Sequence, residues 1–216
     1  MILSPVSASP ADETMDVSVH DVDSNGAVKE LHRASGGPWG ISCVNDIFVA
    51  WLTQLLGEDM MKNYKDGHLE EYYDMLQKIP NSIAMAGRFS TRIESVRVPI
   101  RPIPINQTEM ASNIQRMNLV GDVSCAPGGL KISGQLVESW IKEPISNAIR
   151  HMSGILTEPS MSGVDSVFLV GGFAECPLVQ EAVKKAFSNK RIVIPSQPRE
   201  AVLCWAVLFG RQFTAM

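Results

Sequence analysis

The sequence predicts an α/β fold, in which strands and helices alternate around one layered sheet. Two features carry this prediction. The run Val167-Phe168-Leu169-Val170 is continuously apolar, as is typical of strands buried on both faces of a parallel sheet, and apolar residues at helical spacing follow it over 176–188. Near the start of the chain, residues 14–22 alternate in polarity and lead into Asp23-Ser24-Asn25-Gly26, a sequence typical of a β-hairpin turn.

Local signals set the bounds of the other elements. Gly57 and Gly210 are placed to end helices, and Pro177 and Pro198 are placed to begin them. Pro144 is expected to kink the helix that contains it. The predicted elements, in chain order, are an irregular Ser- and Pro-rich leader at 1–13, strands at 14–22 and 28–34, a helix at 43–56, an insertion at 58–128, a helix at 133–152, a strand at 164–170, a helix at 176–188, a strand at 191–194 and a helix at 199–209.

Residues 58–128 differ in character from the segments on either side. A polar helix is predicted around 68–78, and the three prolines between 93 and 105 allow only an edge strand or an extended segment there. A Pro127-Gly128-Gly129 turn closes the region. The predicted domains are therefore an irregular leader at 1–13, an α/β lobe made of 14–57 and 129–216, and an inserted subdomain at 58–128.

The composition of the chain narrows the classes of function. The 216 residues are 45% hydrophobic and 19% charged, which is ordinary for a soluble globular protein. A net charge of −4 gives no basic field for nucleic acid, and no apolar run approaches the roughly 20 residues that span a bilayer. We therefore expect neither nucleic acid nor a membrane span among the partners of the chain, whose protein partners are unknown.

The cysteines and histidines are scattered along the sequence. No two of them have a spacing typical of metal ligands, so no metal site is expected, and the histidines are expected to be solvated or structural. Reduced cysteines are typical of a cytoplasmic protein. The residues concerned are Cys43, Cys125, Cys176, Cys204, His20, His32, His68 and His151.

A candidate binding site lies directly after the apolar run. In layered α/β sheets, ligands bind at the carboxyl ends of strands, where the turns expose backbone N–H groups. Gly171-Gly172 occupies such a turn, and without Cβ atoms its backbone can approach a phosphate or a flat ring closely. The glycine pair alone is equally typical of a tight turn that binds nothing.

The longer string Val167-Phe168-Leu169-Val170-Gly171-Gly172-Phe173-Ala174-Glu175-Cys176-Pro177 resembles the adenosine motif of the heat shock protein 70 family. It is similar above all to the divergent branch of heat shock 70 kDa proteins 12A and 12B. The loop Gly36-Gly37-Pro38-Trp39-Gly40 and the strand Met15-Asp16-Val17-Ser18-Val19 fit the same branch. The resemblance extends over 14–211 and is faint across 58–128.

The resemblance implies an actin-like ATPase fold of the ribonuclease H-like class, with two lobes facing a nucleotide cleft. Only the second lobe and its inserted lid have counterparts here, so the family's catalytic lysine and first phosphate loop are not matched. The family implies ATP or ADP as ligand, with Mg²⁺ only where phosphate is bound, and no catalytic residue is assigned. The site residues implied are Gly171, Gly172 and Phe173 for adenosine, Gly36, Gly37 and Gly40 for the cleft-side loop, and Thr14 and Asp16 for phosphate and metal.

The sequence departs from the family at the second phosphate loop. The family pattern is Asp-x-Gly-Gly-Gly-Thr-x-Asp, of which only Thr14 and Asp16 remain. Pro10 removes a backbone donor, and Asp12 and Glu13 bring negative charge toward negative phosphates. The apolar strand expected before this loop is missing or replaced by residues 1–6.

Three functions remain open on the sequence. The first is a fragment or truncated paralogue that binds adenine nucleotide at most weakly and does not hydrolyse ATP alone. The second is a non-catalytic interaction protein that keeps the fold for a partner surface. The third is an incomplete gene model of a longer ATP-binding, chaperone-like protein, which a transcript read further upstream would reveal.

Overall fold

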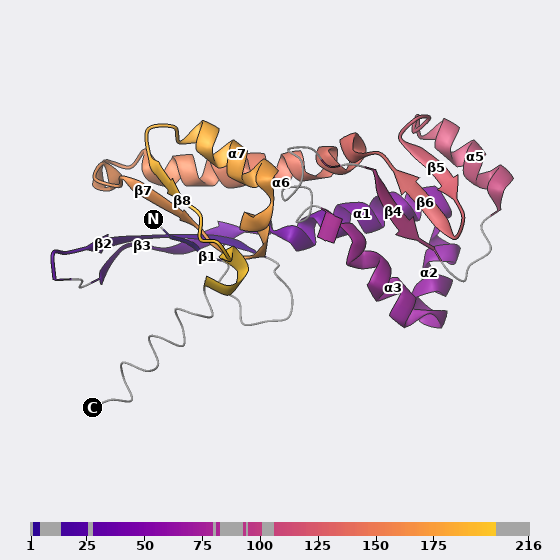
Figure 1. Cartoon of the computed structure of the whole chain (residues 1–216), viewed down its shortest axis with the longest axis horizontal. Coiled ribbons are helices and arrows are strands. Elements are labelled where there is room, and N and C mark those ends of the chain that lie inside the picture. Colours follow the sequence, from indigo (N-terminus) through magenta and orange to yellow (C-terminus); the bar gives the residue numbers. More distant parts are fainter. Residues whose placement is uncertain are drawn as a thin grey trace, which may run out of the picture. The chain divides into compact units, whose positions relative to one another are not determined.

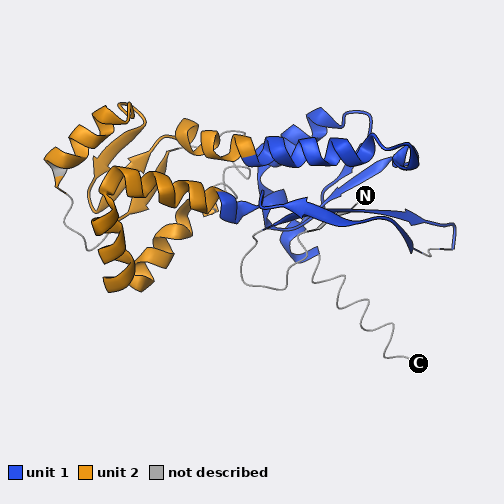
Figure 2. Ribbon diagram, turned by 180° about the vertical axis from the view of Figure 1, so that it is seen from behind, with its two compact units in different colours: residues 1–43, 144–216 blue, residues 44–143 orange. Residues whose placement is uncertain are grey.

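A computed structural model describes residues 2–4, 14–25, 28–79, 81–82, 93, 95–100 and 106–201 (Figure 1). The chain divides into two compact units, residues 1–43 with 144–216 and residues 44–143 (Figure 2). The division falls inside two helices, α1 (Ile41–Leu56) and α6 (Gly134–Leu156). In α6 it falls at Pro144, which has no backbone N–H to donate to the helix.

A five-stranded sheet forms the first unit, with the strand order β3-β2-β1-β7-β8. The strands β1, β7 and β8 run parallel, whereas β2 is antiparallel to both β1 and β3. All four predicted strands lie in this one sheet, and the strand at 164–170 is interior, as predicted. The bounds are Ile2–Ser4 for β1, Met15–Val22 for β2, Val28–Gly37 for β3, Ser166–Leu169 for β7 and Arg191–Val193 for β8.

The prediction of an irregular leader at 1–13 is wrong for Ile2–Ser4. These residues form the middle strand of the sheet, with Ile2 opposite Ser18 on one side and Phe168 on the other. Ile2–Ser4 therefore lie where the resemblance requires a strand. Three residues are too few to show an alternating pattern, and pairing with distant strands alone makes them a strand. The rest of the leader, 5–13, lies outside the described residues.

Helices cover one face of this sheet. Figure 1 shows the second part of α6 and α7 (Pro177–Ala186) on the same side of it. Short 3-10 helices at Pro159–Met161 and Gly172–Glu175 lead into and out of β7. The side chains buried between these layers include Val17, Val19, Met152, Val167, Leu169, Val179 and Val183. Phe168 is 38% exposed, so the prediction that the run at 167–170 is buried on both faces is wrong. The predicted last helix is described only from 198 to 201.

The second unit is built from helices and a small antiparallel sheet of order β4-β6-β5. Its helices, besides parts of α1 and α6, include α2 (Glu58–Gly67), α3 (Leu69–Leu76) and α5 (Gln107–Arg116). Its strands are β4 (Val96–Pro99), β5 (Val123–Ala126) and β6 (Gly129–Ile132). The sequence predicted α3, the extended segment around β4 and the turn before β6, but neither α2 nor β5.

An aromatic cluster forms part of the core of the second unit. The rings of Trp51 and Trp140 lie 5.1 Å apart between centroids, and Phe48 packs 5.7 Å from Trp140. Gly57, at φ +92°, ends α1, and Asn113 on α5 donates to the carbonyl oxygen of Leu55 at 2.9 Å. None of the helices within the described part of the chain is long and apolar enough to cross a membrane.

Candidate functional site

The sheet topology gathers the predicted site residues of the first unit at one edge. The parallel strands β1 and β7 end there, and β3 ends and β2 begins there because β2 is antiparallel to both of its neighbours. Asp16 lies opposite Ser4 on one side and Gly36 on the other, so these three residues form one row across the sheet. Gly171 follows the end of β7 at the same edge, as the parallel pairing of Leu3 with Leu169 requires.

The turn after β7 is built around Gly171. This residue is buried and has φ 92° and ψ 174°, a conformation that essentially only glycine adopts. Its N–H donates to the carbonyl oxygen of Pro198 at 2.7 Å, which joins the turn after β7 to the segment after β8. The 3-10 turn that follows starts at Gly172, and Cys176 N–H bonds to the oxygen of Phe173 at 3.1 Å.

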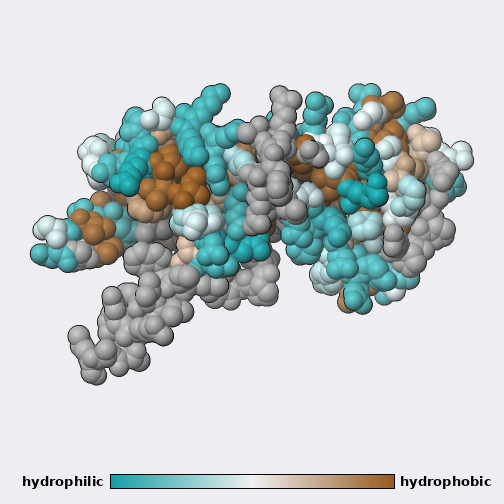
Figure 3. All heavy atoms as spheres, in the orientation of Figure 1, coloured by the Kyte–Doolittle hydropathy of each residue, from teal (hydrophilic) through white to brown (hydrophobic). Residues whose placement is uncertain are grey.

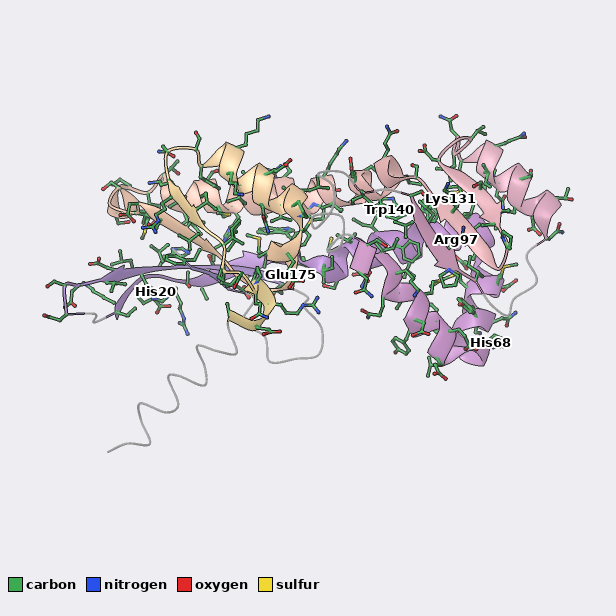
Figure 4. The ribbon with its side chains drawn as sticks, viewed as in Figure 1. His20, His68, Arg97, Lys131, Trp140 and Glu175 are labelled. Carbon is green, nitrogen blue, oxygen red and sulfur yellow. The ribbon has the colours of Figure 1, made fainter. Side chains whose placement is uncertain are left out.

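Side chains from the surrounding segments brace this turn. Gln180 on α7 donates from Nε2 to the carbonyl oxygen of Ala174 at 2.7 Å. Arg199 Nε lies 3.9 Å from Glu175 Oε2, with the Arg199 side chain 61% exposed. Figure 4 shows Glu175 at the end of the sheet where β1 and β8 terminate. Gln180 and Glu175 could not be identified from the sequence, because these contacts depend on the tertiary path of the chain.

Thr14 and Asp16 are the residues expected on the phosphate side that the structure describes. Thr14 donates from Oγ1 to Asp16 Oδ2 at 3.1 Å, and both residues are half-buried. Over the described residues, no group of three or more His, Cys, Asp or Glu side chains could hold a metal ion. The residues Pro10, Asp12 and Glu13 lie outside that part of the chain. Asp16 is thus a single carboxylate, which binds Mg²⁺ well only together with ligand oxygens or water.

Packing within the protein accounts for two glycines of the cleft-side loop. A Cβ on Gly36 would lie 1.8 Å from the carbonyl oxygen of Met15, so the β2–β3 pairing itself requires glycine there. A Cβ on Gly37 would lie 2.7 Å from the indole ring of Trp39. Gly40 is buried directly before α1. The loop therefore needs Gly36 and Gly37 for its own structure, whether or not it contacts a ligand.

A second group of side chains lies beside this loop and was missed in the sequence. Ser35 Oγ is 2.8 Å from His32 Nε2 and 3.0 Å from His151 Nε2. The ring of His151 also packs against Trp39, with 5.3 Å between ring centroids. Because His151 is 116 residues from Ser35 in the chain, no local pattern could have connected them.

Comparison with characterised sequences gives the family. No family model matches the chain. The chain is 30% identical over 203 residues to heat shock 70 kDa protein 12A from Mus musculus, covering 91% of this chain and 30% of the relative. It is 30% identical over 205 residues to heat shock 70 kDa protein 12B from Homo sapiens, covering 92% of this chain and 30% of the relative. The chain thus spans about 30% of the length of these relatives. It belongs to the branch of the heat shock protein 70 family that contains heat shock 70 kDa proteins 12A and 12B.

Proposed function

We propose that this chain corresponds to the second lobe of an actin-like ATPase domain, binds adenine nucleotide weakly and does not hydrolyse ATP alone. The lobe comprises 14–57 and 129–216 together with the strand Ile2–Ser4, and 58–128 form its lid. The protein acts in the cytoplasm as a fragment or truncated paralogue of its relatives. One observation carries the proposal. The turn at Gly171 and the residues Asp16 and Gly36 share one sheet edge, where ligands of layered α/β folds bind.

Two features of the turn after β7 support the assignment of adenosine to it. The N–H groups at the start of a helical turn have no partner within the turn. Those of Gly172 and Phe173 have no backbone partner among the residues that the structure describes. Gly172 has no Cβ, so a ring can approach this backbone closely. We therefore assign the adenosine contact to Gly172 and Phe173, with Gly171 shaping the turn.

The side of the site that would meet the phosphates is less suited to bind them. Two unit charges about 4 Å apart repel by about 4 kcal/mol at an effective dielectric of about 20. Asp12 and Glu13 would bring such charges toward the phosphates, and the loop glycines that could offset them are absent from the sequence. Phosphoryl transfer also needs charges positioned on both sides of the phosphate. The chain supplies one side at most, and hydrolysis is therefore not expected.

A variant pair tests the adenosine assignment. Gly172→Leu places a side chain where the ring is proposed to lie, and adenosine binding should fall below detection. Gly163→Leu is the matched control, because no atom outside its immediate neighbours lies within 4 Å of a Cβ at Gly163. Loss of binding in both variants, or in neither, would refute the assignment, provided that circular dichroism shows both to be folded.

A non-catalytic interaction protein is the second candidate, because apolar side chains are exposed at one end of the sheet. Val22 is 61% exposed, Val28 64% and Leu31 41%. They lie on the hairpin of β2 and β3, whose apolar surface is visible in Figure 3. Sedimentation at increasing concentration, comparing the natural chain with Val28→Thr, tests whether this surface mediates association.

A further inference from the structure

We infer that His151 is a positioning residue, which holds the loop 36–40 in the conformation required for nucleotide binding. The part of this inference that concerns nucleotide rests on the proposed function. The part that concerns the loop does not. His151 lies on α6, whereas the loop ends β3 and leads into α1, so the contact joins segments that are far apart in the chain.

The first contact is a pair of hydrogen bonds through one hydroxyl. Ser35 Oγ lies 2.8 Å from His32 Nε2 and 3.0 Å from His151 Nε2. A hydroxyl has one proton and two lone pairs, so Ser35 can hydrogen-bond to both rings at once, either donating to one and accepting from the other or accepting from both. Ser35, the residue directly before Gly36, is thereby fixed from both sides.

A β-bulge makes this arrangement possible. Residues three apart in a regular strand point to opposite faces, so His32 and Ser35 would not meet. The β2–β3 pairing shifts between Val17, which faces Ser35, and Val19, which faces His32, so that β3 has one extra residue in this interval. Such an extra residue re-aims the side chains around it. The bulge therefore turns His32 and Ser35 to the same side, where they meet His151.

The second contact is through Trp39. Its indole packs against His151, with centroids 5.3 Å apart and ring planes at 57°. The indole also lies against Gly37, where a Cβ would lie 2.7 Å from the ring atoms. The backbone N–H of Trp39 also donates to the carbonyl oxygen of Gly37 at 2.7 Å. One imidazole thus contacts both ends of the short segment from Ser35 to Trp39.

Within the part of the chain that the structure describes, the loop has few other attachments. There β3 is an edge strand of the sheet, and β2 is its one neighbour. The pairing of β3 with β2 continues past the bulge for two more residues, with Gly36 opposite Asp16 and Gly37 opposite Met15. Adjacent glycines have a larger entropy to lose on ordering than other residues. A tether from α6 restricts this freedom and keeps Gly36 beside Asp16.

The test uses the whole chain and two measurements. Amide hydrogen exchange of Gly36, Gly37, Trp39 and Gly40 reports on the loop, and adenosine titration reports on the site. Ser35→Ala removes the hydroxyl alone, His151→Phe keeps a ring against Trp39 but removes the hydrogen bond, and His151→Ala removes both contacts. His20→Ala is the matched control, because His20 makes a similar 3.0 Å contact with Ser18 on the same hairpin (Figure 4).

One lost hydrogen bond should speed loop exchange about fivefold, and His151→Ala should have the largest effect. Adenosine affinity should fall in all three variants, and most in His151→Ala. Amide exchange at 167–169 should stay unchanged in them, and His20→Ala should match the natural chain in both measurements. Unchanged loop exchange in all three variants would overturn the inference, as would equal acceleration at 167–169, the sign of a merely structural role. Faster loop exchange with unaltered adenosine affinity would overturn the link to the site. If the natural chain binds no adenosine, the proposed function fails, while faster loop exchange still supports the positioning of the loop.

Discussion

The backbone N–H of Gly171 donates a 2.7 Å hydrogen bond to the carbonyl oxygen of Pro198. This bond fixes the turn after β7 against the segment after β8, at the edge where the other candidate site residues lie. It also occupies the donor of the first glycine in the Gly-Gly pair. Among the described residues of the turn, the backbone N–H groups of Gly172 and Phe173 are then left to meet a ligand, and we place the candidate adenosine contact at these two residues.

Gly171→Ala should destabilise the folded chain. A residue other than glycine at φ 92° and ψ 174° is strained by about 1–3 kcal/mol. Urea unfolding should show a loss of stability within that range, with the unfolding slope unchanged. Gly163→Ala, at an exposed position with free space around it, should leave stability nearly unaltered. Equal stabilities of the two variants would mean that the Gly171 turn has a different backbone.

Alkaline pH should weaken the second unit through Tyr72. Burial raises the pKa of this phenol above its usual value of 10.0, and the nearby Tyr73 and Asp46 raise it further. The unfolded chain therefore loses this proton first as pH increases. The contribution of Tyr72 to stability is complete below pH 10 and declines as pH rises beyond it. Tyr72→Phe should reduce the decline seen in unfolding curves between neutral pH and pH 11, and an identical pH profile in the variant would contradict this.

The isolated chain should not turn over ATP. The carboxylate of Asp16, bonded to Thr14, is the one charge at the phosphate side of the described site, and catalysis requires charges on the opposite side as well. Phosphate release should equal that of buffer, in the natural chain and in Asp16→Ala alike. Release above buffer that disappears in Asp16→Ala would show that this side of the site suffices for hydrolysis.

The elements that the sequence could predict are those with long local patterns. Examples are the alternation in β2, the apolar run in β7 and the helical spacing in α7. In each of these elements the buried residues recur at a regular spacing, so the pattern can be recognised from the local sequence. The strand β1 has three residues and becomes a strand only through its partners β2 and β7. The helix α2 is largely polar, with only Met61 and Tyr64 buried, and so its periodicity is weak.

Some features of the candidate site could likewise be predicted from the local sequence, and others could not. Gly171 and Gly172 could be predicted because glycines directly after a buried strand mark a tight turn at a sheet edge. The bond to Pro198 could not, since it depends on how β8 returns beside β7. The contact between Ser35 and His151 depends on a bulge in β3 and on the path of α6, neither of which has a local signal. The packing requirement for glycine at position 37 could not be predicted either, because it depends on the indole of Trp39, which lies where a Cβ would be.

The most direct test of the account compares adenosine, ADP and ATP as ligands of the natural chain, with and without Mg²⁺. If the turn at Gly172-Phe173 is the main contact and the phosphate side is impaired, all three should bind with similar weak affinity, about 0.1 mM or weaker, and Mg²⁺ should change little. Isothermal titration or ligand-observed NMR can measure this range. Binding of ATP with Mg²⁺ at least tenfold tighter than adenosine, about 1.4 kcal/mol, would contradict the account and show that the region around Thr14 and Asp16 still binds phosphate.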